Sequence, residues 1–214
     1  MIDKYLNTGK RLYTCFVDFK KAFDTIWREG LFYKLLNQGI DKSFVKLLIS
    51  MYSRQISCVN IGDYITKSFQ TTTGLKQGCN LSPNLFNIFI DDITNCFDTN
   101  KCDPAKLITE KINCLLYADD LVLISDSATG LQNCLNSLNQ YTKKWKLSIN
   151  FDKTKAMIIS KRAIKSKQIF TIGDTKIDIC NSYKYLGTQI NNNGSFKGNS
   201  IMLNKKAIYK CLHF

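Results

Sequence analysis

The sequence has few histidines and few prolines. It contains one histidine, His213, and two prolines in 214 residues. Its nine cysteines include no C-x-x-C pair, so a structural zinc site is not expected. An odd number of scattered cysteines also argues against a disulfide framework. We expect most of them to act as small hydrophobic residues in a reducing compartment.

Long apolar runs and a targeting segment are also missing. No stretch approaches the roughly 18 uninterrupted apolar residues of a membrane span. The N-terminus, Met1 to Tyr5, lacks the basic and apolar regions of a signal peptide. With 44% hydrophobic and 12% aromatic residues, the composition is typical of a globular protein with one sizeable core. We therefore expect a soluble intracellular protein.

Acidic residues are few relative to basic ones, 17 against 30, which gives a net charge of +13. The basic excess gathers at residues 143–146, 153–155 and 161–167. Such a stripe suits a polyanion, either a nucleic acid backbone or an anionic membrane surface. Because excess charge also keeps proteins soluble, the stripe alone does not decide between these functions.

The central stretch, Leu115 to Ile124, places two adjacent carboxylates between two apolar runs. The apolar flanks predict a buried β-hairpin with Asp119 and Asp120 at its turn. Adjacent like charges are costly unless a cation lies between them, and a hard divalent ion such as Mg²⁺ would offset their repulsion. Asp-Asp is also ordinary turn chemistry, so the pair alone leaves both interpretations open.

The order of the predicted elements indicates an α+β fold. With insertions set aside, the central elements follow one another as a strand at 12–17, a helix at 82–98, strands at 113–118 and 121–125, a helix at 128–145 and a strand at 155–160. This is the split βαβ, or ferredoxin-like, pattern of an antiparallel sheet with flanking helices. Its first strand usually lies next to its third, which would bring Asp18 beside Asp119 and Asp120. Three convergent carboxylates favour the metal site over the solvated turn.

Other elements are predicted from local signals. They are helices over 28–37, 43–52 and 200–212, a hairpin over 56–71 that turns at Gly62-Asp63, and a loop over 99–110. Ser43 and Ser82 are expected to cap the helices that they begin. The predicted buried face of the helix over 43–52 comprises Phe44, Leu47, Leu48 and Met51.

With these residues in place, the sequence resembles reverse transcriptases, and more closely those of non-LTR (LINE-type) retrotransposons. Five motifs in family order carry the resemblance: Phe16 to Asp24, Gly74 to Pro83, Tyr117 to Asp120, Asn150 to Lys155 and Tyr183 to Gly187. The box Tyr117 to Asp120 alone is a weak signal, whereas five ordered motifs over nearly the whole chain are specific.

The resemblance implies a reverse transcriptase domain over residues 1–214, with a polymerase palm, partial fingers and no thumb. The implied parts are palm elements at 12–24, 74–98 and 113–160, a primer-grip region at 168–190, and the start of a thumb connection at 198–214. We therefore expect a palm-centred part of a retrotransposon polyprotein, or the remnant of a decayed element.

The resemblance also assigns catalytic roles. Asp18 and Asp119 would bridge two Mg²⁺ ions, or Mn²⁺ as the alternative, with Asp120 assisting and the Phe19 carbonyl completing the shell. One ion would lower the pKa of the primer 3′-hydroxyl, and the other would hold the triphosphate and leaving group.

Substrate-binding roles follow in the same way. Phe23 would lie under the incoming sugar and exclude a 2′-hydroxyl, and Gln77 would contact the nucleotide and the template base. Lys153 would protonate or screen the pyrophosphate, with Lys155 as the competing candidate. Phe23 also fits an ordinary core residue, Gln77 ordinary loop polarity, and Lys153 a solvated surface lysine.

The primer backbone would be held by Tyr183, Lys184 and Tyr185, although these tyrosines also fit simple core packing. The implied partners are an RNA template, a DNA primer and dNTPs, without a membrane and with no protein partner defined. The implied location is the nucleus, the cytoplasm or both.

Three alternatives stay open. A group II intron-type maturase is one, although the form of the second motif, Leu75 to Cys79, fits non-LTR elements better. A catalytically inactive RNA- or DNA-binding remnant would keep salt-sensitive RNA binding that Asp119→Asn does not change. A membrane-surface protein is the least favoured, because no exposed amphipathic helix backs the basic residues.

Overall fold

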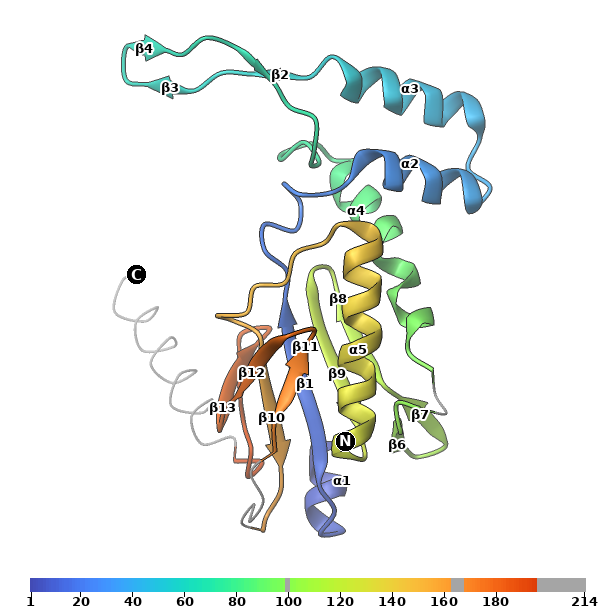
Figure 1. Ribbon diagram of the computed structural model, residues 1–214, viewed down its shortest axis with the longest axis vertical. Helices are drawn as coiled ribbons and strands as arrows, with labels where there is room; N and C mark the ends of the chain where they lie inside the picture. Colours follow the sequence, from blue (N-terminus) through green and yellow to red (C-terminus); the bar gives the residue numbers. More distant parts are fainter. Residues whose placement is uncertain (99–100, 163–167, 196–214) are drawn as a thin grey trace, which may run out of the picture. The chain divides into compact units, whose positions relative to one another are not determined.

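The computed structural model describes residues 1–98, 101–162 and 168–195 (Figure 1). The chain forms two compact units, which we describe separately. The sheet unit comprises residues 1–18, 95–140 and the described chain from Ile149 on, and the helical unit comprises residues 19–94 and 141–148. The predicted helix over 200–212, the thumb connection at 198–214 and residues 163–167 of the basic stripe lie outside the described residues.

The sheet unit is built on six strands in the order β11-β12-β10-β1-β9-β8. β1 is buried along six of its seven residues and pairs antiparallel with both β10 and β9. The predicted pairing of the first strand with the third is therefore confirmed. The strands are β1 (Leu12–Asp18), β8 (Cys114–Tyr117), β9 (Asp120–Ser125), β10 (Lys155–Ile159), β11 (Phe170–Ile172) and β12 (Thr175–Ile179).

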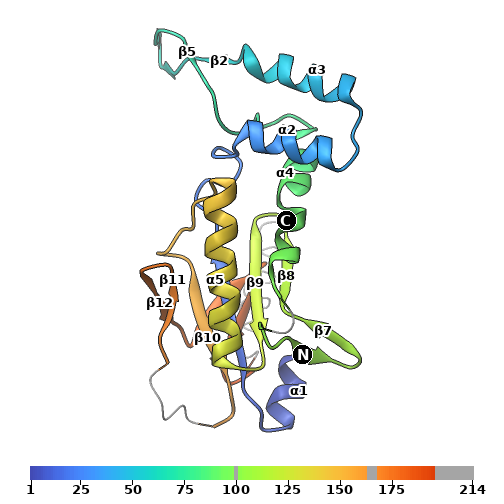
Figure 2. The same ribbon diagram turned by 45° about the vertical axis from the view of Figure 1, so that its right-hand side comes forward.

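α5 (Ala128–Trp145) lies over one face of this sheet (Figure 2). The Ser127 hydroxyl accepts the N–H of Gly130 at 2.9 Å and so caps the start of the helix predicted over 128–145. The apolar side chains that recur at helical spacing face the sheet, as their burial requires. The fully buried ones are Leu131, Cys134, Leu135 and Leu138.

The other face of the sheet carries a second apolar cluster. It is covered by α1 (Ile2–Asn7) and by side chains from the hairpin of β13 (Ser182–Tyr185) and β14 (Thr188–Asn191). Alternate residues of each strand point to this face. The cluster contains Tyr5, Leu6, Leu12, Phe16, Ala105, Val122, Ile124, Met157 and Ile159. α1 was not predicted, because six residues are too few for a helical period to stand out.

The predicted loop at 99–110 is wrong in its second half. β6 (Ala105–Leu107) and β7 (Glu110–Ile112) form a hairpin in which Lys106 lies opposite Lys111. Each strand has only three residues, and their charged side chains obscure the alternation that identifies a strand.

The helical unit contains α2 (Arg28–Asn37), α3 (Lys42–Ser53) and α4 (Ser82–Ile90), which continues as a 3₁₀ helix, Asp91–Cys96. The predicted helix over 82–98 thus changes type partway. Two short ladders follow α3, one between β2 (Ile56–Ser57) and β5 (Phe69–Gln70), the other between β3 (Asn60–Ile61) and β4 (Tyr64–Ile65). The turn at Gly62-Asp63 is as predicted. No helix in the described part of the chain is long and apolar enough to span a membrane.

The predicted serine caps are wrong. The Asp41 carboxylate caps α3 by accepting the N–H groups of Ser43 and Phe44 at 2.9 and 3.1 Å. Asp41 and Ser43 are both good capping residues, so sequence alone did not separate them. At α4, the Ser82 hydroxyl instead donates to the carbonyl of Lys76 at 2.6 Å.

The predicted buried face of α3 is confirmed only at Leu48. Phe44, Leu47 and Met51 are 40%, 56% and 57% exposed. Apolar residues occupy more than one side of this helix, so periodicity did not fix its phase, and packing against α2 selects another stripe. The residues buried on that stripe are Val45, Leu48 and Tyr52.

A buried lysine anchors the end of α5 in the helical unit. Lys34 donates to the Asp92 carboxylate and to the Phe89 carbonyl, both at 2.5 Å. Its ammonium lies 3.8 Å from the centre of the Trp145 ring, a favourable cation–π geometry. Burial lowers the pKa of Lys34, and the Asp92 carboxylate opposes this shift.

Candidate active site

Strands β1 and β9 place opposite each other two of the carboxylates that the sequence predicts to bind metal. Asp18, the last residue of β1, pairs with Asp120, the first residue of β9. Asp119 lies in the two-residue turn between β8 and β9, which Tyr117 and Asp120 close. Ala118 in this turn has a φ of +51°, a conformation that costs a non-glycine residue about 1–3 kcal/mol. The predicted placement of Asp18 beside Asp120 is confirmed, and Asp119 lies next to Asp120 in the turn. β8, in contrast, is half-exposed and not buried as expected.

The carboxylates repel one another. Burial raises the pKa of Asp120 above its ordinary value, and the charges of Asp119 and Asp18 raise it further. Burial, followed by the charges of Asp18 and Asp120, also raises the pKa of Tyr183. Negative charge is therefore concentrated at this end of the sheet.

Asp18, Asp119 and Asp120 offer carboxylate oxygens, which are the ligands that a hard divalent cation prefers. A cation here would relieve the repulsion at Asp120. Among the residues that the structure describes, no three His, Cys, Asp or Glu side chains are already arranged to hold a metal ion. The strand pairing thus brings the carboxylates together, while their side chains would still have to converge on an ion.

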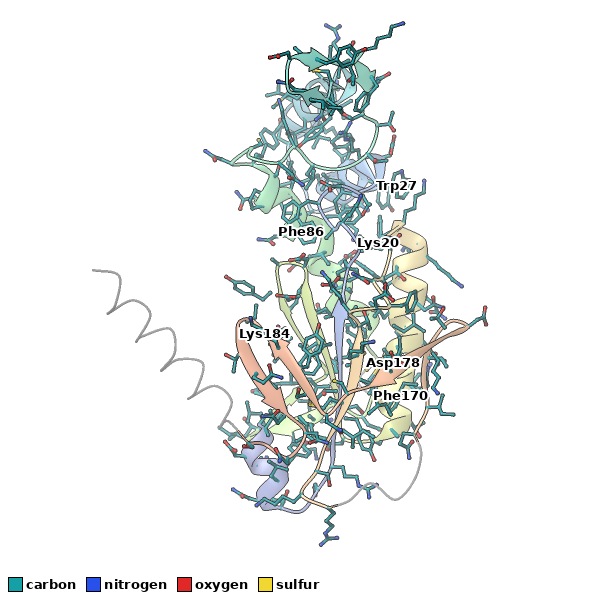
Figure 3. The ribbon with its side chains drawn as sticks, turned by 90° about the vertical axis from the view of Figure 1, so that its left-hand side faces the viewer. Lys20, Trp27, Phe86, Phe170, Asp178 and Lys184 are labelled. Carbon is teal, nitrogen blue, oxygen red and sulfur yellow. The ribbon has the colours of Figure 1, made fainter. Side chains whose placement is uncertain are left out.

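Lys153 and Lys155 have different partners. Lys153 Nζ lies 3.9 Å from the Asp18 carboxylate and is 68% exposed. Lys155 Nζ lies 2.7 Å from Asp178, labelled in Figure 3, and lowers the pKa of that carboxyl. Of the two candidate lysines, Lys153 is therefore the one beside Asp18, and its action on pyrophosphate stays a prediction.

The helical unit brings Phe23 and Gln77 together. The Phe23 ring stacks on Phe86, with ring centres 4.5 Å apart and planes 17° apart. Gln77 Nε2 donates to the Asp24 carboxylate at 2.7 Å, and both predicted nucleotide-binding residues line one cavity of about 510 Å³. Phe19, the predicted carbonyl ligand, begins this unit with its side chain buried.

Main-chain contacts lock the loop that carries Gln77. The N–H of Leu75 donates to the Phe23 carbonyl at 2.8 Å, and that of Gly74 donates to the Ile26 carbonyl at 2.9 Å. Gly74 has a φ of +82°, and a Cβ there would lie 2.4 Å from the Asp24 carbonyl oxygen. Only glycine fits this position, which explains one of the two glycines in the motif.

Arg28 is a structural residue of this site that the sequence analysis missed. It is 5% exposed, and its guanidinium donates five hydrogen bonds. The sequence signal was an arginine in the first turn of a helix, where the macrodipole disfavours positive charge. The acceptors are the carbonyls of Gly74, Tyr52, Thr71 and Thr73 and the side chain of Gln55.

The predicted primer-binding residues lie on β13, and Figure 3 labels one of them, Lys184. The Tyr183 ring stacks on Phe16, with ring centres 4.3 Å apart and planes 9° apart, and Tyr185 tilts against the same ring at 5.8 Å. Both tyrosines pack against the second apolar cluster, while Lys184 between them is exposed. The core-packing interpretation of the tyrosines therefore holds, and their contact with a primer stays a prediction.

Replacing Asp120 with asparagine is expected to stabilise the protein at neutral pH in metal-free buffer. Because the pKa of Asp120 is raised, the folded chain holds this proton more tightly than the unfolded chain. Stability is therefore lost as pH rises above the ordinary value of 3.8. We expect a Tm above that of wild type at pH 7, with the difference vanishing near pH 3. Thermal unfolding followed by circular dichroism measures it.

Asp178→Asn is the matched control, with the opposite sign. Lys155 lowers the pKa of Asp178, so this carboxylate stabilises the fold above its ordinary pKa and loses that effect as pH falls. The Asp178 variant should be slightly less stable than wild type at pH 7. An Asp120 variant that is also less stable at pH 7 would contradict the repulsion argument.

A family model described as reverse transcriptase (RNA-dependent DNA polymerase) matches residues 2–190. The chain is 28% identical over 208 residues to a Pol polyprotein from the R2 retrotransposable element of Popillia japonica, covering 92% of this chain and 34% of that protein. It is 27% identical over 190 residues to the RNA-directed DNA polymerase of the mobile element jockey from Drosophila funebris, covering 86% and 20%. The chain thus spans about a third or less of these relatives.

Solved structures support the fold. A telomerase from Candida tropicalis, in complex with a fragment of telomeric RNA, aligns with a TM-score of 0.62 at 15% identity, covering 93% of this chain and 31% of that one. The apo telomerase from the same organism aligns with a TM-score of 0.61 at 16% identity, covering 88% and 36%. The fold is thus polymerase palm-like and α+β. The chain belongs to the reverse transcriptase (RNA-dependent DNA polymerase) family, and its similar curated proteins are polymerases of non-LTR retrotransposons, as the motifs predict.

Proposed function

We propose that this chain is the RNA-directed DNA polymerase domain of a non-LTR retrotransposon protein. It would extend a DNA primer on an RNA template with dNTPs, using two divalent metal ions, Mg²⁺ or Mn²⁺. The observation that carries the proposal is the pairing of Asp18 with Asp120, with Asp119 in the adjoining turn. A two-ion nucleotidyl transfer needs carboxylate ligands gathered in this way.

The residues of this chain would divide the reaction between them. Asp18, Asp119 and Asp120 would hold the ions, which supply charge stabilisation at the attacking and leaving oxygens. Lys153 would neutralise or protonate the departing pyrophosphate, and its exposed ammonium beside Asp18 supports that role. Because little covalent chemistry falls to the protein, positioning and electrostatics would supply most of the catalysis.

We also infer the finer architecture. The strand order β10-β1-β9-β8, with α5 between β9 and β10, supports the ferredoxin-like split βαβ pattern. Within the helical unit, α2, α3 and the two short ladders would then correspond to part of the fingers, whereas α4 would be a palm helix. Tyr183, Lys184 and Tyr185 would form the primer grip, and the polymerase would act in the nucleus, the cytoplasm or both.

Primer extension by the purified chain tests this function. The substrate is a DNA primer annealed to an RNA template, with dNTPs and Mg²⁺ at low salt. Asp119→Asn removes one carboxylate at nearly constant size, and Asp178→Asn is the matched control on β12. We expect extension by wild type and the Asp178 variant but not by the Asp119 variant.

Two results would contradict the proposal in different ways. Extension by all three proteins would mean that Asp119 is not part of the site. No extension by a folded wild type that still binds the primed template in low salt would favour a nucleic-acid-binding function for this chain.

Phe23→Ala is expected to relax sugar selectivity. The stack on Phe86 fixes the ring orientation, so the ring can act as a rigid barrier to a 2′-hydroxyl. Removing it should lower the preference for dNTPs over NTPs by about 10- to 100-fold. Single-nucleotide kcat/KM values for a dNTP and the matching NTP measure it. Phe32→Ala, which removes another half-buried ring of the helical unit, should leave selectivity unchanged. Unaltered selectivity in the Phe23 variant would assign this ring to the core.

A further inference from the structure

The backbone of Asp18 is held by a loop that follows α5. On the β10 side, the last strand pair is Phe16 with Lys155, so β10 gives Asp18 no ladder partner. The N–H of Asp18 instead donates to the Thr154 hydroxyl oxygen at 3.2 Å. The Asp18 carbonyl accepts the N–H of Asn150 at 2.8 Å.

The loop that makes these contacts is itself closed. The N–H of Thr154 donates to the Asn150 carbonyl at 2.9 Å, which joins the two residues that hold Asp18. Thr154 is 0% exposed, whereas Lys153 beside it is 68% exposed and lies near the Asp18 carboxylate. Asn150 and Thr154 thus form a clamp on the Asp18 main chain, in which the Thr154 hydroxyl is the side-chain group. Removing this hydroxyl would leave the Asp18 N–H without its acceptor.

We propose that Thr154 is a positioning residue, which fixes the Asp18 carboxylate for metal binding by accepting the Asp18 N–H in the clamp formed with Asn150. This inference rests on the proposed function for its metal. Asp18 lies at the end of β1, where a strand would fray without a partner on both sides. The clamp takes the place of the ladder hydrogen bonds that β10 does not supply. It therefore restrains the Asp18 main chain in the metal-free protein.

The same contact has a purely structural interpretation, in which Thr154 only stabilises the sheet. The two interpretations predict different effects of replacing Thr154. A structural residue alters the unfolding transition, whereas a positioning residue also alters divalent ion affinity and local opening at Asp18. Partners that orient metal ligands typically change metal affinity by about 10- to 100-fold when they are replaced.

Thr154→Val tests the proposal, because valine keeps the shape and removes the acceptor. The first measurement is Mn²⁺ binding to the full chain without nucleic acid, followed by electron paramagnetic resonance. We expect affinity to fall about 10- to 100-fold. The second is amide hydrogen exchange of Asp18 in metal-free protein, read by NMR, which should accelerate by about tenfold or more because the donor loses its partner.

Thr14→Val is the matched control. Thr14 lies on the same strand, is 4% exposed, and donates its hydroxyl to the Met157 carbonyl at 3.1 Å. Its replacement therefore removes a buried threonine hydrogen bond between β1 and β10, away from the carboxylates. Mn²⁺ affinity and Asp18 amide exchange should match wild type in this variant. Thr154→Ser, which keeps the hydroxyl, should also match wild type in both measurements.

Each outcome decides the inference. Equal Mn²⁺ affinity in the Thr154→Val and Thr14→Val variants would overturn it and leave Thr154 a structural residue. If Thr154→Val does not fold, weakened binding by Thr154→Ser would overturn it, because packing and not the hydroxyl would then matter. Absence of Mn²⁺ binding to wild type at tens of millimolar would also overturn it. Metal binding with the expected variant pattern, but without primer extension, would support the clamp and count against the proposed function.

Discussion

Replacing Arg28 with methionine is expected to lower the free energy of unfolding of the helical unit by about 3–5 kcal/mol. Methionine fills a similar volume but donates nothing to the four carbonyls that Arg28 now holds. An unpaired buried acceptor costs about 1–3 kcal/mol, and water reaching part of the loop limits the sum. No ion pair among the described residues includes Arg28, so the loss is one of hydrogen bonds.

Urea unfolding followed by tryptophan fluorescence measures this effect. Both tryptophans of the chain, Trp27 and Trp145, lie in the helical unit and report on it directly. Arg54→Met is the matched control, because Arg54 is exposed at the end of α3. Arg28→Lys keeps the charge without the planar fork and should fall between the two. Equal urea midpoints for the Arg28 and Arg54 methionine variants would refute the role assigned to Arg28.

Asparagine at Asp18 is expected to lower kcat by about 10³-fold or more while the fold persists. A carboxamide cannot supply the charge that a divalent ion requires, and 10³-fold corresponds to about 4 kcal/mol of transition-state stabilisation. The clamp of Thr154 and Asn150 contacts the main chain of Asp18, so the substitution leaves it intact. The loss should therefore be chemical and not structural.

Single-turnover incorporation of one nucleotide at saturating Mg²⁺ measures the Asp18 effect, and thermal unfolding checks the fold. The lost contact with Lys153 is long, at 3.9 Å, and largely exposed, so it contributes little to stability. A variant that retains more than a tenth of the wild-type rate would remove Asp18 from the metal site. If the Asp18→Asn variant loses its cooperative thermal unfolding transition as well as its activity, Asp18 has a structural role.

Much of the site was open to prediction because its signals are local. Two apolar runs around Asp119 and Asp120 predicted a hairpin, and Gly62-Asp63 predicted a turn. The element order predicted that β1 lies beside β9, which brings Asp18 to Asp120. Each inference depends on neighbours in sequence or on a general rule of connectivity, so none required knowledge of side-chain packing.

Two of the errors, at the cap and at the buried face of α3, lie where two local choices were nearly equal in energy. Asp41 and Ser43 are both good caps, and α3 is apolar on more than one side. Sequence patterns rank such choices poorly. Contact with α2 decided which stripe of α3 is buried.

By itself, the sequence determined the order of the central strands and helices, the motifs and the residues that supply charge at the site. Only the tertiary structure decided how those residues are held. The contact of Thr154 with Asp18 joins residues 136 apart in sequence, and that of Arg28 with Gly74 joins residues 46 apart. Lys153 and not Lys155 lies beside Asp18, because Lys155 pairs with Asp178 on another strand. Hydrogen bonds between distant segments leave no periodic trace in a sequence, since they depend on which backbone groups the fold leaves without a ladder partner.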